Sequence, residues 1–192
     1  MKKIFKLIFL VILTGFKIQA QDFEMFMDVD GIPGEYVTNP NRASVFTPAP
    51  NAQTIAILSS DFIESRTIAK NNNTMEPGNP NLIREMEISF ILDKATPLLL
   101  EKMWQRQLIS SIKIYTDRLY NNGLNQDEFI KTELTDVFIK SISMQSSEES
   151  APVFSMTITF EKIKRSFALR DNYNVLIDAG NFNFNYVIND VD

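Results

Sequence analysis

The stretch MFMDVDGIPGE, residues 25–35, contains the change of pattern that decides the fold. Apolar side chains at Met25, Met27 and Val29 recur at every second residue, which is the period of a β-strand. The last six letters, DGIPGE, are rich in residues that form turns. The stretch therefore predicts an opening strand that ends in a tight turn.

Residues 1–20 have the pattern of a secretory signal peptide. Lysines precede an apolar run from Leu7 to Phe16, and the segment closes on the small residue Ala20. The run is shorter than the roughly 20 residues of a membrane-spanning helix. We expect export to the periplasm or the medium, with cleavage after Ala20. An uncleaved anchor and a misassigned start codon are the alternatives, and the absence of a following cysteine excludes lipid attachment there.

Cleavage would leave residues 21–192, a length that suits a single domain. The mature chain would keep 15 Lys and Arg against 24 Asp and Glu, a net charge near −9. Such a surface repels phosphate groups, so we expect no nucleic acid partner and no stable membrane insertion once the leader is removed. The net charge does not exclude a local basic patch at Lys162, Lys164 and Arg165.

Cysteine and histidine are both absent from the sequence. Their absence removes disulfides, thiolate nucleophiles, imidazole bases and ordinary zinc sites. We therefore expect no enzyme, no cofactor, no metal and no catalytic residue.

The remaining route to catalysis is a pair of carboxylates, as in glycosidases. The candidates are Asp28, Asp30 and Glu35 near the opening turn and Glu148 with Glu149 in a polar stretch. We expect solvated or turn-capping roles for all five, because no neighbouring group is expected to shift their pKa values. The string DVDG resembles the start of a calcium loop but lacks the later oxygen ligands, so a metal site is rejected.

Most of the chain carries β-strand patterns separated by polar loops. Strands are expected over 54–69 (one long or two short), 84–92, around 112–115, 129–143 with a bulge near Asp136, and 154–160. Loops are expected at 37–53 and 70–81, a turn at 121–123 and a polar connection at 145–151. Several strands without a βαβ rhythm predict an antiparallel barrel or sandwich.

One segment, residues 97–107, has the period of a helix. Thr96 is placed to cap it and Pro97 suits its first turn. Apolar side chains recur at steps of three and four residues, in Leu100, Met103, Trp104 and Leu108. We expect this stripe, with the single tryptophan, to pack on the core.

The C-terminal residues 168–192 are rich in asparagine. Val175 to Ile177 and Phe182 to Ile188 flank the turn-like residues 178–181, which predicts an added hairpin at the edge of the sheet.

Four blocks, in this order, resemble the haemolysin-coregulated protein (Hcp) family of bacterial type VI secretion. They are MFMDVDGIPGE at 25–35, ISFILDKATPLLLEKMW at 88–104, LTDVFIKSISM at 134–144 and VFSMTITFEKIKRSF at 153–167. The resemblance covers roughly 23–167.

The resemblance implies a small antiparallel β-barrel with one flanking helix. It also implies hexameric rings that stack into a tube and carry effectors, with spike and effector proteins as further partners. Three features depart from the family: the leader, the length of the 37–53 loop and the tail from 168 onward. An exported, non-enzymatic binding module with the same barrel, using that loop and tail for recognition, is the alternative function.

Overall fold

The structure is a computed structural model. It describes residues 23–38, 42–44, 53–62, 68–71, 74–77, 85–120, 125–148 and 150–185, with backbone only at 68–71, 74–77, 120 and 125. The predicted leader and the 121–123 turn lie outside these residues.

Eleven strands and one helix make up the described part of the chain. In order they are β1 (Phe23–Val29), β2 (Arg42–Ala43), β3 (Ile55–Phe62), β4 (Ile68–Asn71), β5 (Thr74–Pro77), β6 (Glu85–Ile91), α2 (Thr96–Trp104), β7 (Ile109–Tyr120), β8 (Asn125–Ser147), β9 (Ser150–Thr159), β10 (Lys162–Arg170) and β11 (Leu176–Asn185). None of the helices in the described ranges is long and apolar enough to cross a membrane.

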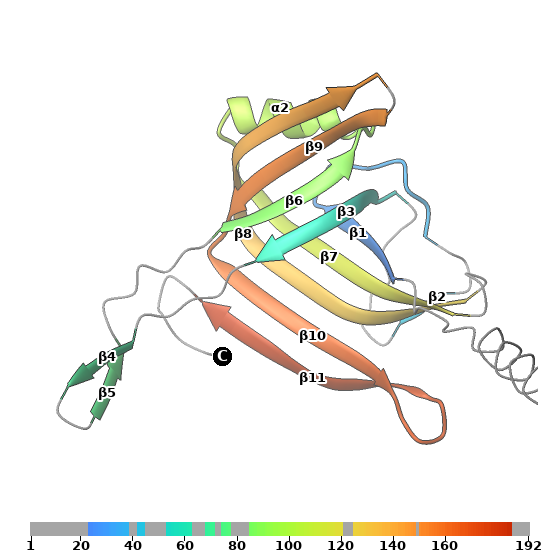
Figure 1. Ribbon diagram of the computed structural model, residues 1–192, viewed down its shortest axis with the longest axis vertical. Coiled ribbons are helices and arrows are strands. Elements are labelled where there is room, and N and C mark those ends of the chain that lie inside the picture. The colour runs from blue at the N-terminus through green and yellow to red at the C-terminus, as the bar shows by residue number, and fades with distance from the viewer. Residues whose placement is uncertain are drawn as a thin grey trace, which may run out of the picture.

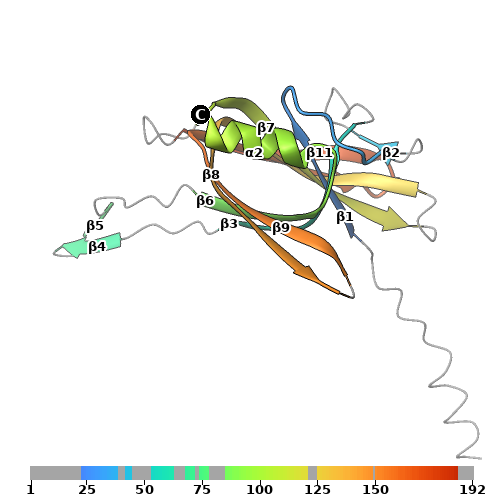
Figure 2. The same cartoon turned by 90° about the horizontal axis from the view of Figure 1, so that it is seen from above.

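The main sheet closes on itself into a barrel. Its order is β11-β10-β8-β7-β1-β3-β6-β9, and β9 pairs in turn with β8. The strands β8, β7, β1, β3, β6 and β9 therefore form a ring, seen from above in Figure 2, with α2 lying against it. The strands β10 and β11 extend the sheet beyond this ring, at the lower end in Figure 1. Every pairing in the ring is antiparallel, which confirms the predicted fold class.

The ring closes because β8 is one bent strand of 23 residues. Its first part pairs with β7 and β10, and its last part, from Phe138, pairs with β9. Between the two parts Asp136 has a φ of 56°, in the left-handed region. The irregularity predicted near Asp136 is therefore confirmed, and it is the point where the strand changes neighbours.

The interior is filled by alternate side chains of the ring strands. Phe154, Met156 and Ile158 on β9 are all buried, as their alternation predicts. The same core includes Met27, Val29, Ile55, Ile88, Phe90, Ile112, Leu134 and Phe160.

The helix is shorter than predicted and faces the core with different residues. It ends at Trp104, and Arg106 follows with a φ of 53°, which stops helical propagation. Leu99 is fully buried and Met103 packs on the core one turn later. Trp104, one residue further round at the helix end, is 80% exposed. The prediction that Trp104 packs in the core is wrong, because the stripe facing the sheet is shifted by one residue.

The cap at the start of the helix also differs from the prediction. Ala95 is the N-cap, and Thr96 is the first helical residue. The Thr96 hydroxyl accepts the N–H of Asp93 at 3.1 Å, and the Asp93 carboxylate accepts the N–H of Ala95 at 2.8 Å. Thr96 thus fixes the turn before the helix.

Two predicted loops contain strands. Arg42–Ala43 in the 37–53 segment pair in parallel with Gln126–Asp127 of β8. In the 70–81 segment, β5 pairs with β4 in a small hairpin. Strands as short as β2, β4 and β5 have weak sequence signals, because they are too short to show a sustained period.

The C-terminal turn was also predicted in the wrong place. Residues 178–181 lie inside β11, which runs without a break from Leu176 to Asn185 and pairs with β10. Gly180, with a φ of 125°, absorbs a shift of register opposite Phe167 and Ala168, so the glycine makes a bulge instead of a turn. The turn of this hairpin falls at 171–175.

Candidate functional site

The opening turn is held tightly against the start of β3. Gly31 has a φ of 74°, which a glycine adopts without strain. A Cβ at Gly34 would lie 2.1 Å from the carbonyl oxygen of Thr54, so no larger residue fits there. Tyr36 and Thr54 then exchange both backbone hydrogen bonds, at 2.8 and 3.0 Å. The glycines of DGIPGE therefore direct the chain back along β3.

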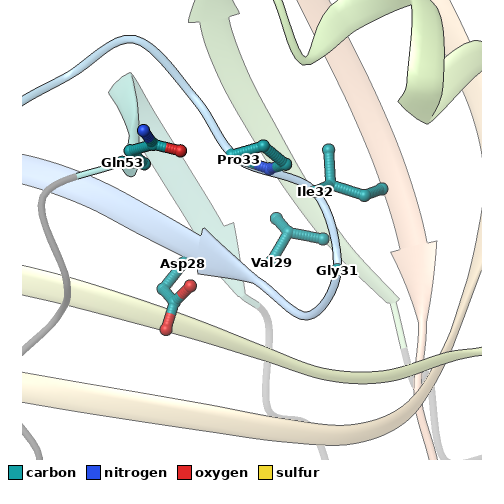
Figure 3. A pocket seen from close by; sticks show the side chains of 6 residues that line it. All are labelled: Asp28, Val29, Gly31, Ile32, Pro33 and Gln53. Carbon is teal, nitrogen blue, oxygen red and sulfur yellow. The ribbon is translucent and has the colours of Figure 1, made fainter.

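A shallow pocket of about 280 Å³ lies beside this turn (Figure 3). Its lining is Asp28, Val29, Gly31, Ile32, Pro33 and Gln53. Figure 3 shows the Asp28 carboxylate pointing away from the Gln53 amide, on the other side of β1. A binding pocket for a small molecule needs several polar groups that converge on it. This hollow has no such arrangement.

The candidate carboxylates are not brought together into a catalytic pair. Asp28 is half-buried on β1, whereas Asp30, Glu35 and Glu148 are exposed and Glu149 lies outside the described residues. The backbone N–H of Glu35 donates to Asp93 at 2.9 Å. Among the described residues, no group of three acidic side chains is arranged to hold a metal ion.

The structure instead buries a different set of charged groups, on the outer face of the ring. Arg42, on β2, donates from Nε to Asp117 Oδ2 at 2.5 Å and from Nη2 to Asp117 Oδ1 at 3.1 Å. Its Nη2 also lies 3.1 Å from Glu128 Oε1. The arginine side chain is 4% exposed, and both carboxylates are fully buried. We call these three residues the Arg42 cluster.

Aromatic rings enclose the Arg42 cluster. The guanidinium carbon lies 5.5 Å from the ring centre of Phe26 and 5.1 Å from that of Tyr115. Phe26 in turn stacks between Tyr115 and Tyr36, at 5.2 and 5.3 Å. Both faces of β1 are therefore covered, one by the barrel core and the other by the segment that carries Tyr36 and Arg42.

The enclosure shifts the protonation equilibria of the cluster. Burial raises the pKa of Asp117 to about 6, although Arg42 acts in the opposite direction. Burial alone would lower the pKa of Arg42, but Asp117 and Glu128 outweigh it and the net shift is upward. Burial, with the hydrogen bond to Glu24, raises the pKa of Tyr36 above its ordinary value. Arg42 therefore stays charged, and the pKa of Asp117 lies at about 6.

A second buried carboxylate lies on the other face of β8. Asp127 is 1% exposed and accepts Arg170 Nε at 2.5 Å and Arg170 Nη2 at 2.7 Å. Arg118 lies 3.7 Å from the same carboxylate. We call Asp127, Arg118 and Arg170 the Arg170 cluster. Because Arg170 is the last residue of β10, this cluster fastens the β10–β11 hairpin to the start of β8.

Analysis of the sequence missed both clusters. Gln126, Asp127 and Glu128 are consecutive and all buried, so both faces of β8 are covered at this point. A run of polar residues normally indicates exposure. The sequence offers one weak signal: Arg42 is the one charged residue of the 37–53 segment.

In the described part of the chain, the closed ring of antiparallel strands and the helix that lies against it define a small β-barrel protein. Residues 26–167 match the family described as "Type VI secretion system effector, Hcp". The chain belongs to the Hcp family of type VI secretion proteins, and its function is that of the secretion tube protein.

Solved structures of Hcp proteins share the fold. Hcp1 from Salmonella typhimurium is 17% identical, with a TM-score of 0.58, over 88% of this chain and 99% of that one. A type six secretion system protein is 12% identical, with a TM-score of 0.71, over 89% of this chain and all of the other. A type VI secretion system effector from Yersinia pestis is 20% identical, with a TM-score of 0.54, over 84% of this chain and 98% of that one. None of the curated protein sequences matches this chain.

Proposed function

We propose that this protein acts by shape alone, as a subunit whose six copies close into a ring, and that the rings stack into the tube of a type VI secretion system. The single observation that supports this most directly is the match of residues 26–167 to the Hcp family, on a barrel with no convergent catalytic groups among its described residues. Spike proteins and effectors are the further partners of such a tube.

The two additions to the barrel are compatible with a rigid ring subunit. The segment after the opening turn is fastened by the Arg42 cluster, and the β10–β11 hairpin by the Arg170 cluster. Segments fixed by buried ion pairs keep one position, which a repeated contact between copies requires.

We also propose that residues 1–20 direct export and are removed, leaving 21–192 as a single domain. The basic, apolar and small-residue regions of the leader support this. Sequencing the N-terminus of protein recovered from the periplasm or medium tests it. A mature protein that begins at Gln21 is expected, whereas a protein that begins at Met1 would contradict the proposal.

Size-exclusion chromatography with light scattering, followed by negative-stain imaging, tests the ring. The expected result is a mass six times that of the mature chain and ring-shaped particles. A protein that stays monomeric at high concentration, with no rings, would overturn the proposal.

A complementation experiment tests the function in cells. Expression of this protein should restore type VI secretion in cells that lack their own tube protein.

A further inference from the structure

The segment after the opening turn lies across the outer face of β1. Tyr36 is held to Thr54 by two backbone hydrogen bonds, at 2.8 and 3.0 Å. A few residues later, β2 pairs in parallel with the start of β8. Figure 1 shows β2 at the ends of β7 and β8 that lie away from α2. We call residues 36–38 and 42–44 the strap.

The strap has few apolar contacts to hold it in place. Tyr36 stacks on Phe26 at 5.3 Å, but the neighbouring Val37 is 64% exposed. The strand β2 has only two residues. Segments with few buried apolar contacts separate from a protein at a lower free energy than its core unfolds. The position of the strap therefore depends largely on the Arg42 cluster.

The strap covers aromatic side chains that would otherwise face water. Phe26 and Tyr115 lie outside the barrel core, yet they are only 0% and 1% exposed. The Arg42 guanidinium lies over both rings, at 5.5 and 5.1 Å from their centres. Separation of the strap would expose these two rings and would let water reach the carboxylates of the Arg42 cluster.

The charges in the Arg42 cluster do not balance. Asp117 and Glu128 are both fully buried, and Arg42 is the one cation between them. Ser44, also on the strap, donates its hydroxyl to Glu128 at 2.5 Å but is neutral. When both carboxylates are ionised, one negative charge is buried without a counter-charge. Binding of a single proton removes this excess.

The groups around the cluster do not correct the imbalance. Burial is the main cause of the raised pKa of Asp117, and the charges of Glu128 and Glu24 add to it. Lys131, further along β8, lies 3.3 Å from Glu133, so its charge is already paired. The other titratable side chains that face the cluster are the two tyrosines, Tyr36 on the strap and Tyr115 on β7.

The closed strap also leaves polar atoms unsatisfied. Arg42 Nη1 and Gln126 Oε1 are buried without a hydrogen-bond partner among the described residues. A buried donor or acceptor without a partner costs free energy that contact with water would recover. Both the excess charge and these two atoms therefore favour separation of the strap, against the stacking of Tyr36 and the ion pairs of Arg42.

We propose that the strap is a pH-sensitive cover, which stays closed over the Arg42 cluster in acid and separates from β1 more often as the pH rises. In acid, the closed cluster holds one cation, one anion and one protonated carboxyl group. Ionisation of Asp117 creates the excess negative charge, and separation of the strap lets water solvate it. Neither this proposal nor its test depends on ring formation.

The direction follows from the proton affinities of the two forms. The pKa of Asp117 is about 6 in the closed form, because the carboxyl group is buried. In the open form, water surrounds this carboxyl group, and its pKa returns to the ordinary value of 3.8. The open form binds the proton less tightly, so opening is favoured as the pH rises. The opening equilibrium constant should increase about tenfold between pH 5 and pH 7.

Native-state hydrogen exchange of the unmodified protein tests the proposal, with rates corrected for the intrinsic effect of pH. The backbone N–H groups of Tyr36 and Thr54 report on the strap, and those of β9 report on the core. The strap amides are expected to exchange through a smaller opening than the β9 amides, with the tenfold rise in the opening constant. Exchange of both sets only in step, through global unfolding, would overturn the proposal. A strap opening constant that does not change with pH would overturn it as well.

Two matched substitutions test whether Asp117 is the group that titrates. Asp117→Asn keeps the shape of the side chain and is expected to abolish the pH dependence of the Tyr36 amide. Glu133→Gln makes the same chemical change outside the cluster, at a side chain that is 32% exposed, and is expected to keep the tenfold rise. Circular dichroism checks that both variants fold. A pH dependence that persists in Asp117→Asn, or that disappears in Glu133→Gln, would contradict the proposal.

Discussion

The Arg42 cluster and the Arg170 cluster solve the same structural problem in different surroundings. Each fastens a peripheral segment near the start of β8, one on each face of the sheet, by an arginine that binds a buried aspartate. Arg42 is 4% exposed, whereas Arg170 is 24% exposed. The comparison teaches that solvent access decides how much stability is lost when one partner of an ion pair is removed. A fully buried charge that loses its partner stays unpaired, whereas a charge near the surface can be solvated by water.

The largest effect is expected from Arg42→Ala. The substitution leaves Asp117 and Glu128 buried without a counter-charge, which destabilises proteins by about 3–5 kcal/mol. Urea denaturation measures the free energy of unfolding. A loss below about 1 kcal/mol would show that water reaches the cluster and would remove the contrast with Arg170.

A smaller effect, about 1–2 kcal/mol, is expected from Arg170→Ala. Asp127 keeps Arg118 at 3.7 Å, and the vacated site opens to solvent. Hydrogen exchange should show faster opening of β11 than of β7. If this variant loses as much stability as Arg42→Ala, the difference in exposure does not govern the two clusters.

The third prediction concerns the pH dependence of the free energy of unfolding and tests the buried carboxylate of the Arg42 cluster. Burial raises the pKa of Asp117 in the folded protein from its ordinary value of 3.8 to about 6, so the folded protein binds this proton more tightly than the unfolded chain. Asp117 therefore contributes more stability below pH 6, and that contribution falls as the pH rises through 6. Between pH 5 and 7 the free energy of unfolding should fall by about 1 kcal/mol on this account.

Asp117→Asn is the matched variant, since it keeps the shape of the side chain and an oxygen that accepts from Arg42. Subtracting its pH profile from that of the unmodified protein isolates Asp117. Identical profiles for the two proteins would mean that Asp117 does not titrate in this range.

The smallest effect is expected at an exposed pair. Lys140 Nζ lies 2.5 Å from Glu85 Oε1, and both side chains are largely exposed, at 57% and 41%. Lys140→Ala should change the free energy of unfolding by about 0.5 kcal/mol or less, because water and salt screen such pairs. A loss comparable to that of Arg170→Ala would break the ranking by exposure.

The sequence was a good guide wherever one face of a strand is buried. The alternation of Phe154, Met156 and Ile158 located β9, and the change of phase near Asp136 located the bend of β8. It was a poor guide where neighbours decide. Trp104 lies outside the core because the helix phase is set by contact with the sheet, and Gly180 lies in a bulge because β10 pairs across it.

The clusters could not have been predicted, for a related reason. Arg42 and Asp117 are 75 residues apart, and the strand that carries Arg42, β2, has only two residues. No local period marks so short a strand.

The sequence by itself determined the class of this protein: strands with one apolar face, one short helix, and neither cysteine nor histidine for chemistry. Those properties are local, because side-chain alternation and composition are written along the chain. Only the tertiary structure decided which charges of the described residues are sealed from water and which strands lie side by side. Both depend on which distant segments cover one another, and burial is a property of that covering and not of any residue alone.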